Sequence, residues 1–339
     1  MNAISKLAFV AASLFAANFV FGQASPTAPA MNVLIGGVSA NDAQAASADK
    51  FAELLTKYSN GRLKASARNG GSLGTNAQML AVLQAGSLHA MIGPSGSMAT
   101  AVPELGLFDM PFLLPGAPAN ITAFAAQSKA AARMMELAEQ KGIRILGFHG
   151  IGPQSLLTRF PVNKVADIQG KNLRVIPSPA RLGSLQDWGV VARPMEFAEI
   201  YTSLQQGTID GLTAAPDITL KSKWHEVAKY LTITEHFAFA SILQVSKKWF
   251  DGLPKDLQDV VIRTGKETIA FADGEFAKAQ DSSLEVLRKT ITVTNMPAAE
   301  LEKMKDLTRK GVWERMKADP QRGPFVKLLE EDLARYNKK

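Results

Sequence analysis

The sequence predicts an α/β protein made of two lobes, and three observations support this. Short β-rich runs alternate with helical patterns every ten to fifteen residues, as in parallel sheets with crossover helices. The chain has 339 residues, enough for two such units rather than one core. Residues 83–90 (LQAGSLHA) and 204–211 (LQQGTIDG) share one pattern. Either both copies are a common helix-ending device, or two lobes built alike face each other across a cleft.

The first half of the chain supplies the elements of the first lobe. Apolar and β-branched runs predict strands at residues 32–38, 62–67, 88–92 and 143–149. Apolar residues at helical spacing predict helices at residues 45–58, 75–86 and 121–140. Asn60-Gly61 and Gly86 end the first two helices, because these residue types tolerate the left-handed backbone of a helix end.

The second half repeats the alternation around one arginine. Strands are expected at residues 155–159, 172–176 and 209–212, with a helix at residues 197–206 that ends at Gly207. Pro177 and Pro179 stop the strand that carries Arg174. Strand, helix and strand form a βαβ unit, and ligands collect at the carboxyl ends of such strands. We therefore predict that Arg174 is a fixed cation in a cleft.

The remaining segments connect and close the two lobes. Residues 232–246 form a long β-rich run that is expected to cross from the second lobe back to the first. Residues 254–289 predict one long helix, with Gly265 and Gly274 as possible bends. Two amphipathic helices are expected near the end of the chain, at residues 301–316 and 325–336.

The N-terminal segment predicts export to the periplasm. Lys6 precedes an apolar run at residues 7–21, and Gly22-Gln23-Ala24 supplies the small residues of a cleavage site. This pattern is typical of a signal peptide, residues 1–24, cut after Ala24. The run is shorter than the ~20 residues that a membrane-spanning helix needs. Residues 25–30 (SPTAPA) are expected to be a linker.

Composition argues against several classes of protein. The chain has no cysteine, so it cannot form a disulfide, use a thiol in catalysis or carry a lipid on a cysteine. The formal charge is +7, but acidic residues accompany the basic ones along the helices. Basic runs with interleaved aromatic residues are absent, so we expect no nucleic-acid partner. We expect an exported monomer.

Motifs for catalysis or metal binding are incomplete. The four histidines have no metal-ligand spacing, so neither a metal nor a cofactor is expected. Residues 150–155 (GIGPQS) begin like a dinucleotide-binding loop, but serine replaces the third glycine. Residues 93–97 (GPSGS) lack the spacing of a nucleophile elbow. The sequence gives no positive support for an enzyme.

Several ordered motifs carry a family resemblance across most of the chain. They include DIQGKNLRV at residues 167–175, PMEFAEIY at 194–201 and LQQGTIDG at 204–211, with LFDMPF at 107–112 upstream. Together they resemble the solute-binding proteins of TRAP transporters, the DctP-type family. The resemblance implies a bilobed fold with a lobe-spanning helix, and a TRAP-type membrane permease as partner. It assigns residues 31–151 and 240–279 to the first lobe, and residues 152–239 and 280–339 to the second.

The same resemblance implies roles for particular residues. The family's arginine at the position of Arg174 clamps the ligand carboxylate, as a guanidinium does bidentately. Phe197 matches an aromatic residue that lies against the ligand, although a core position on its helix is an equal alternative. Asn76, Ser95 and Ser97 are expected to supply polar groups from the first lobe.

Two departures from the family pattern bear on the ligand. Gln154 stands where many members carry a second arginine, and Thr213-Ala214 replace a frequent Glu-Asn. We therefore expect a monocarboxylate bound without a metal, with Asp217 near a hydroxyl or amine on its tail. The expected function is capture of a small organic acid for a TRAP-type permease. The alternatives are an exported ligand sensor for a membrane kinase and, with less support, an exported enzyme.

Overall fold

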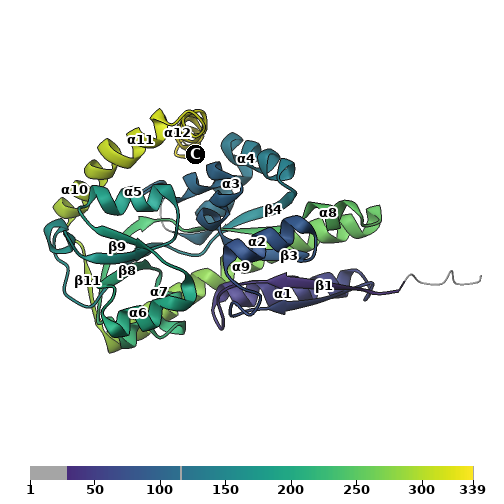
Figure 1. The fold of residues 1–339 in the computed structure, drawn as a ribbon, viewed down its shortest axis with the longest axis horizontal. Helices are drawn as coiled ribbons and strands as arrows, with labels where there is room; N and C mark the ends of the chain where they lie inside the picture. Colours follow the sequence, from purple (N-terminus) through teal and green to yellow (C-terminus); the bar gives the residue numbers. More distant parts are fainter. Residues whose placement is uncertain (1–28, 115–116, 339) are drawn as a thin grey trace, which may run out of the picture.

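The structure, a computed structural model, describes residues 29–114 and 117–338. Two β-sheets lie in separate lobes, each covered by helices, and one long helix, α9 (Lys255–Thr290), runs along both (Figure 1). The predicted bilobed α/β fold is confirmed. The signal peptide and most of the predicted linker lie outside the described residues.

The first sheet is built from the N-terminal third of the chain and one strand that returns to it. Its strands in spatial order are β2 (Leu63–Arg68), β1 (Met31–Gly36), β3 (Ala90–Pro94), β10 (Ala240–Ser246) and β4 (Ile143–Gly150). β10 is antiparallel to both of its neighbours, whereas β1 is parallel to β2 and β3. Helices pack on this sheet: α1 (Ala43–Tyr58), α2 (Asn76–Ala85), α3 (Pro118–Gln127), α4 (Lys129–Gln140) and α8 (Lys247–Asp251).

The second sheet repeats this plan. Its strands in spatial order are β11 (Thr292–Asn295), β9 (Tyr230–Phe237), β5 (Gln154–Thr158), β8 (Gly211–Ala214), β6 (Asn172–Val175) and β7 (Val191–Pro194). Here β5 is the strand that runs antiparallel to its neighbours. Its helices are α5 (Pro179–Asp187), α6 (Ile200–Gln206), α7 (Pro216–Lys221), α10 (Ala298–Thr308) and α11 (Glu314–Ala318).

The chain crosses between the lobes beside the antiparallel strands. β4 of the first sheet leads directly into β5 of the second, and β9 of the second leads back into β10 of the first. The predicted crossing of residues 232–246 is therefore confirmed. Each sheet receives its antiparallel strand from such a crossing, which explains why both lobes have the same plan. Hinges of this kind absorb domain closure in few residues.

The internal repeat has the same structure in both lobes. Gly86 and Gly207 each end a helix in the left-handed conformation, with φ of 91° and 76°. Each next strand begins four residues later, at Ala90 and Gly211. A helix-ending device and a common lobe plan therefore coincide at these two places.

Two predictions of local structure were wrong, and two elements were missed. The helix expected at residues 121–140 is two helices, because Ser128 is extended and caps α4 through a bond from Ala131 N. The strand expected at residues 209–212 begins at Gly211. Between β6 and α6 the chain also forms α5 and β7, which were not predicted; Pro179 starts a helix there as well as ending a strand.

The last helix, α12 (Gly323–Tyr336), returns to the helices of the first sheet. Val326 and Leu329 are buried in the same core cluster as residues of α3 and α4. The predicted lobe boundaries, which assign residues 280–339 to the second lobe, remain a prediction. α12 lies in that range, but it packs on helices of the first sheet.

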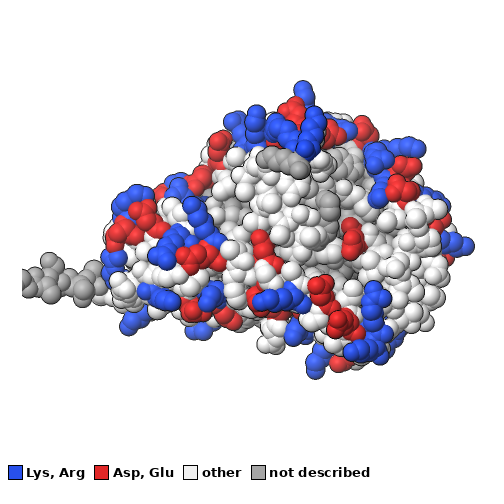
Figure 2. Space-filling model, turned by 180° about the vertical axis from the view of Figure 1, so that it is seen from behind, with Lys and Arg blue, Asp and Glu red and all other residues white. Residues whose placement is uncertain are grey.

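On the face seen in Figure 2, basic and acidic side chains are interspersed. Within residues 29–114 and 117–338, no helix has the length and apolar character needed to span a membrane.

Candidate functional site

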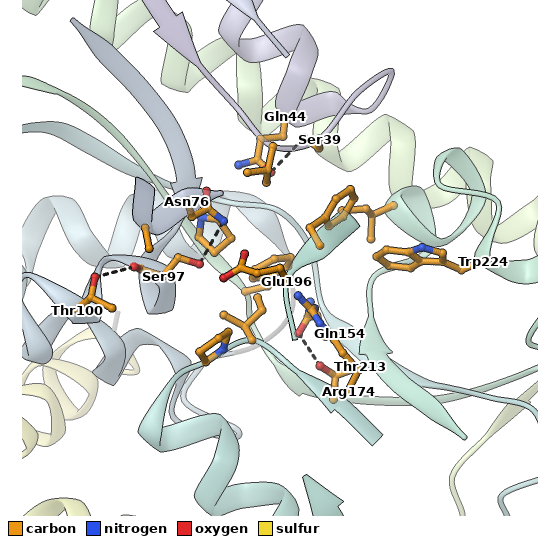
Figure 3. Close-up of a pocket in the computed structure, with 18 residues that line it drawn as sticks. Ser39, Gln44, Asn76, Ser97, Thr100, Gln154, Arg174, Glu196, Thr213 and Trp224 are labelled. Carbon is orange, nitrogen blue, oxygen red and sulfur yellow. Dashed lines mark hydrogen bonds between the residues drawn. The ribbon is translucent and has the colours of Figure 1, made fainter. Parts of the chain in front are cut away.

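A cavity of about 90 Å³ lies between the two lobes. Its walls come from the carboxyl ends of β1, β3, β6, β7 and β8 with the segments that follow them, and from the starts of β5 and α2 (Figure 3). The polar side chains that line it are Ser39, Gln44, Asn76, Ser97, Thr100, Gln154, Arg174, Glu196 and Thr213. Strand ends from both sheets therefore meet at one polar site, as is usual for α/β folds.

Arg174 is the cation of this cavity. It lies on β6, is 6% exposed, and donates from Nε to the carbonyl oxygen of Met195 at 3.0 Å. Within the described chain it forms no ion pair and no other hydrogen bond. Burial, and then the nearby Arg181, lower its pKa to about 9, so the guanidinium stays charged at neutral pH. Its Nη atoms are thus held in place without a carboxylate partner, which is the requirement for an anion site.

A second buried arginine lies close behind the cavity wall, where its charge is already paired. Arg181 on α5 donates from Nη2 to Asp109 Oδ1 at 2.7 Å, and both side chains are fully buried. It also donates from Nη1 to Gln154 Oε1, and its guanidinium packs on the rings of Phe237 and Phe239. Gln154 Oε1 accepts a further bond from Thr213 Oγ1 at 3.3 Å. Gln154, which lines the cavity, therefore has its side-chain oxygen engaged by two donors.

The first lobe contributes amides and hydroxyls. Asn76, the first residue of α2, donates from Nδ2 to Ser97 Oγ at 3.4 Å, while its buried Oδ1 has no partner in the described structure. Thr75 caps this helix through Gln78 N and thereby leaves Asn76 free to face the cavity. On the opposite side, Gln44 accepts from Ser39 and leaves its buried Nε2 without a described partner.

Two features of the cavity were not predicted. Trp224 lines it and packs on Phe197 with ring centroids 5.4 Å apart and planes tilted by 56°. Glu196, next to Phe197 in the chain, points its carboxylate into the cavity (Figure 3). Glu196 belongs to the PMEFAEIY motif, but the motif does not indicate the direction of its side chain. That direction is set by its place between β7 and the following turn, Phe197–Glu199. Nothing near Trp224 in the sequence signals its role.

Of the predicted site residues, five line the cavity. These are Arg174, Phe197, Gln154, Asn76 and Ser97. For Phe197 both alternatives hold, because it lines the cavity and also packs against the apolar cores. The structure places Ser95 and Asp217 elsewhere. Ser95, the first residue of the short 3₁₀ helix Ser95–Thr100, is fully buried, and Asp217 accepts bonds from Ala43 N at 3.2 Å and Ser283 Oγ at 3.4 Å.

An outer cavity of about 460 Å³ adjoins the inner one. The two share four residues: Val38, Glu196, Phe197 and Trp224. These side chains therefore form the partition between the inner cavity and the more open one.

The described residues contain no cluster of three or more histidine or acidic side chains able to hold a metal ion. His149 and His236 are buried, and burial lowers their pKa to about 4 and about 3. Both rings are therefore neutral at pH 7. The expectation that binding needs no metal stays a prediction.

A bilobed α/β fold with a polar cavity between its lobes defines the class of periplasmic solute-binding proteins. The chain belongs to the family described as "Bacterial extracellular solute-binding protein, family 7", which it matches over residues 36–319. It is a periplasmic solute-binding protein of the TRAP transporter type, as its sequence motifs predicted. This family consists of solute-binding receptors rather than enzymes.

Individual relatives agree with this placement. The chain is 28% identical over 310 residues to the 2,3-diketo-L-gulonate-binding periplasmic protein YiaO of Escherichia coli (strain K12), covering 90% of each protein. It is 31% identical over 268 residues, 78% of each, to a solute-binding protein of Sulfitobacter sp. (strain NAS-14.1). It is 27% identical over 249 residues, 71% of this chain and 72% of the relative, to the C4-dicarboxylate-binding protein DctP of Rhodobacter capsulatus.

Solved structures share the fold. The sugar acid binding protein DctPAm of Advenella mimigardefordensis, in complex with galactonate, superposes with a TM-score of 0.83 and 25% identity, covering 90% of this chain and 99% of that one. A TRAP periplasmic solute-binding protein of Desulfovibrio salexigens with bound orotic acid gives the same TM-score, identity and coverage.

Proposed function

We propose that this protein captures a small monocarboxylate in the periplasm and delivers it to a TRAP-type membrane permease. The observation that carries the proposal is Arg174, a buried guanidinium that lines the interlobe cavity and has no carboxylate partner within the described chain. Taking a cation out of water costs free energy unless an anion pairs with it. An incoming carboxylate supplies that pair, bidentately through the two Nη atoms.

The charge of the site supports one ligand carboxylate rather than two. The second arginine near the cavity, Arg181, is already paired with Asp109 and is not among the lining residues. Galactonate and orotic acid, named for two related structures, each carry a single carboxyl group. The relative that binds C4-dicarboxylates shows that other members take diacids. Here a second carboxylate would meet Glu196 instead of a free cation.

Both lobes supply walls of the cavity, which supports capture by closure. Asn76 and Ser97 come from the first lobe, whereas Arg174 and Phe197 come from the second. A ligand that contacts both lobes favours the closed state by its differential affinity for the two states. Closure then presents the permease with a surface that differs between loaded and empty protein.

A thermal-shift screen of the purified protein tests the proposal. Monocarboxylates and dicarboxylates of matched length are added with and without a chelator, and the melting temperature is measured. A ligand at a hundred times its Kd adds about 2.7 kcal/mol of stability, so binders are distinguished clearly. We expect stabilisation by monocarboxylates that a chelator does not remove. Stabilisation by dicarboxylates alone, or by no carboxylate, would contradict the proposal.

A further inference from the structure

Glu196 is an unpartnered acid inside an anion-binding cavity. Its side chain is half-buried and lies in Figure 3 between Ser97 on one side and Gln154 and Arg174 on the other. Across residues 29–114 and 117–338 the carboxylate has no hydrogen bond or ion pair. It is close enough to Arg174 to act on the charge of the guanidinium, together with Glu199.

The neighbouring polar groups do not satisfy this carboxylate. Asn76 donates to Ser97, and Arg181 donates to Asp109 and Gln154. Arg174 uses its Nε on Met195 O and keeps its Nη atoms for an anion. Because Glu196 also lines the outer cavity, water can hydrate it while the lobes are open. When a ligand fills the inner cavity, that hydration is reduced, and a hydrogen-bond donor on the ligand would replace it.

A carboxylic acid with an apolar tail would leave the Glu196 carboxylate without a hydrogen-bond donor. Its carboxylate would pair with Arg174, but its apolar end would displace water from Glu196 and return no hydrogen bond. A negative group at the partition of the cavity also repels anions that approach Arg174. A ligand that carries its own donor at the end opposite its carboxylate replaces the lost hydrogen bond, and an ammonium donor also offsets the repulsion.

We propose that Glu196 is a specificity-determining residue that selects carboxylic acids bearing a hydrogen-bond donor, a hydroxyl or an ammonium group, at the end remote from the carboxylate. This inference deepens the proposed function and rests on it, because Arg174 must bind the ligand carboxylate for Glu196 to contact the opposite end of the ligand. A hydroxyl would donate one charge-assisted bond, while an ammonium would add charge neutralisation. The pocket's Arg174 and Glu196 then face opposite ends of one small molecule.

An isosteric series of acids tests the proposal. Pentanoate, 4-hydroxybutyrate and 4-aminobutyrate have the same length and differ only in a terminal methyl, hydroxyl or ammonium group. One-carbon shorter and longer sets bracket the separation of the two ends. Calorimetry or thermal shift on the full protein should rank the donor-bearing acid of at least one set tenfold or more above its methyl isostere.

Glu196→Gln and Glu196→Ala separate the two sources of the donor. Glutamine keeps an acceptor oxygen, so hydroxy-acid binding should fall by less than tenfold, whereas ammonium-acid binding should fall by more. Alanine should lower binding of both tenfold or more and leave the methyl isostere unchanged or tighter. Glu199→Gln is the matched control, because Glu199 carries the same charge three residues away and lines neither cavity. Unliganded melting temperatures of all variants verify folding.

The outcomes are distinct from those of the proposed function. If acids bind regardless of the terminal group, or if Glu196→Ala weakens methyl and donor-bearing acids equally, carboxylate capture stands and the role of Glu196 falls. If Glu199→Gln has the same effect as Glu196→Gln, the long-range field and not a contact is responsible, and the proposal also falls. If no carboxylate of any set binds, the proposed function itself is contradicted.

Discussion

Arg181 and Asp109 form an ion pair that joins the two lobes in the interior of the protein. Nη2 and Oδ1 lie 2.7 Å apart, and neither side chain is exposed to solvent. Arg181 belongs to α5 of the second lobe, and Asp109 ends the short 3₁₀ helix Pro103–Asp109 of the first. The pair therefore bridges the two lobes close to the interlobe cavity, because Arg181 also donates to the cavity-lining Gln154.

Breaking this pair from one side should be costly. In Asp109→Ala the buried guanidinium of Arg181 loses its only ion partner in the described structure, and we expect a loss of 3–5 kcal/mol, roughly the cost of an uncompensated buried charge. Denaturant unfolding measures the loss. The double variant Asp109→Leu with Arg181→Met should recover much of the stability, because it removes both charges. A single variant as stable as the double would show that the charge is solvated elsewhere.

Asp42 should make stability depend on pH between about 4 and 6. Burial, with a contribution from Asp217, raises the pKa of Asp42 from 3.8 to about 6. As pH rises through this window the unfolded chain loses its proton first, so the free energy of unfolding falls, by up to ~3 kcal/mol at 1.36 kcal/mol per pKa unit. Asp42→Asn keeps an acceptor for Ala45 N and should flatten this fall.

The matched control for that measurement is Asp281→Asn, which changes an exposed carboxylate on α9. Unfolding curves at several pH values between 4 and 7 give the slope for each protein. The same slope in wild type and Asp42→Asn would contradict the assignment.

His149 should produce a slope of the opposite sign. Burial lowers its pKa from 6.5 to about 4, so the folded protein resists the proton that the unfolded chain accepts. Stability is full above pH 6.5 and is lost as pH falls toward 4, by up to ~3 kcal/mol. The ring stacks on Phe276 with centroids 5.4 Å apart, so phenylalanine suits the site. His149→Phe should gain stability relative to wild type as the pH is lowered; a constant difference from pH 7 to pH 4.5 would argue against this.

The sequence predicted what depends on local pattern and missed what depends on contacts between distant segments. Strand and helix alternation, the crossing at residues 232–246 and the position of Arg174 at a strand end all follow from short-range order. The absence of a second arginine at Gln154 was noted, but Arg181 reaches the same place from α5 and donates to Gln154. No spacing rule connects these two positions, because α5 itself begins at a proline that was interpreted as a strand stop.

The same limit applies to Trp224 and Asp217. Trp224 lies in a short turn without periodicity, and its contact with Phe197 arises only when the two segments fold together. Asp217 follows β8, where ligand contacts are expected, yet its carboxylate turns to the N-terminus of α1 and accepts from Ala43 N. An acidic side chain that follows a strand can interact either with a ligand or with the N-terminus of a nearby helix. The position of Asp217 after β8 therefore did not decide between these two roles.

The central claim is that Arg174 binds the ligand carboxylate. The direct measurement is calorimetric titration of the most stabilising acid from the screen into wild type, Arg174→Ala, Arg174→Lys and Arg193→Ala. Arg193 is exposed and pairs with Arg174 in the β6–β7 register, so its loss changes the charge by the same amount outside the cavity. We predict that Arg174→Ala abolishes binding, that Arg174→Lys weakens it at least tenfold, and that Arg193→Ala leaves it within about threefold of wild type. Wild-type affinity in a folded Arg174→Ala variant would contradict the account.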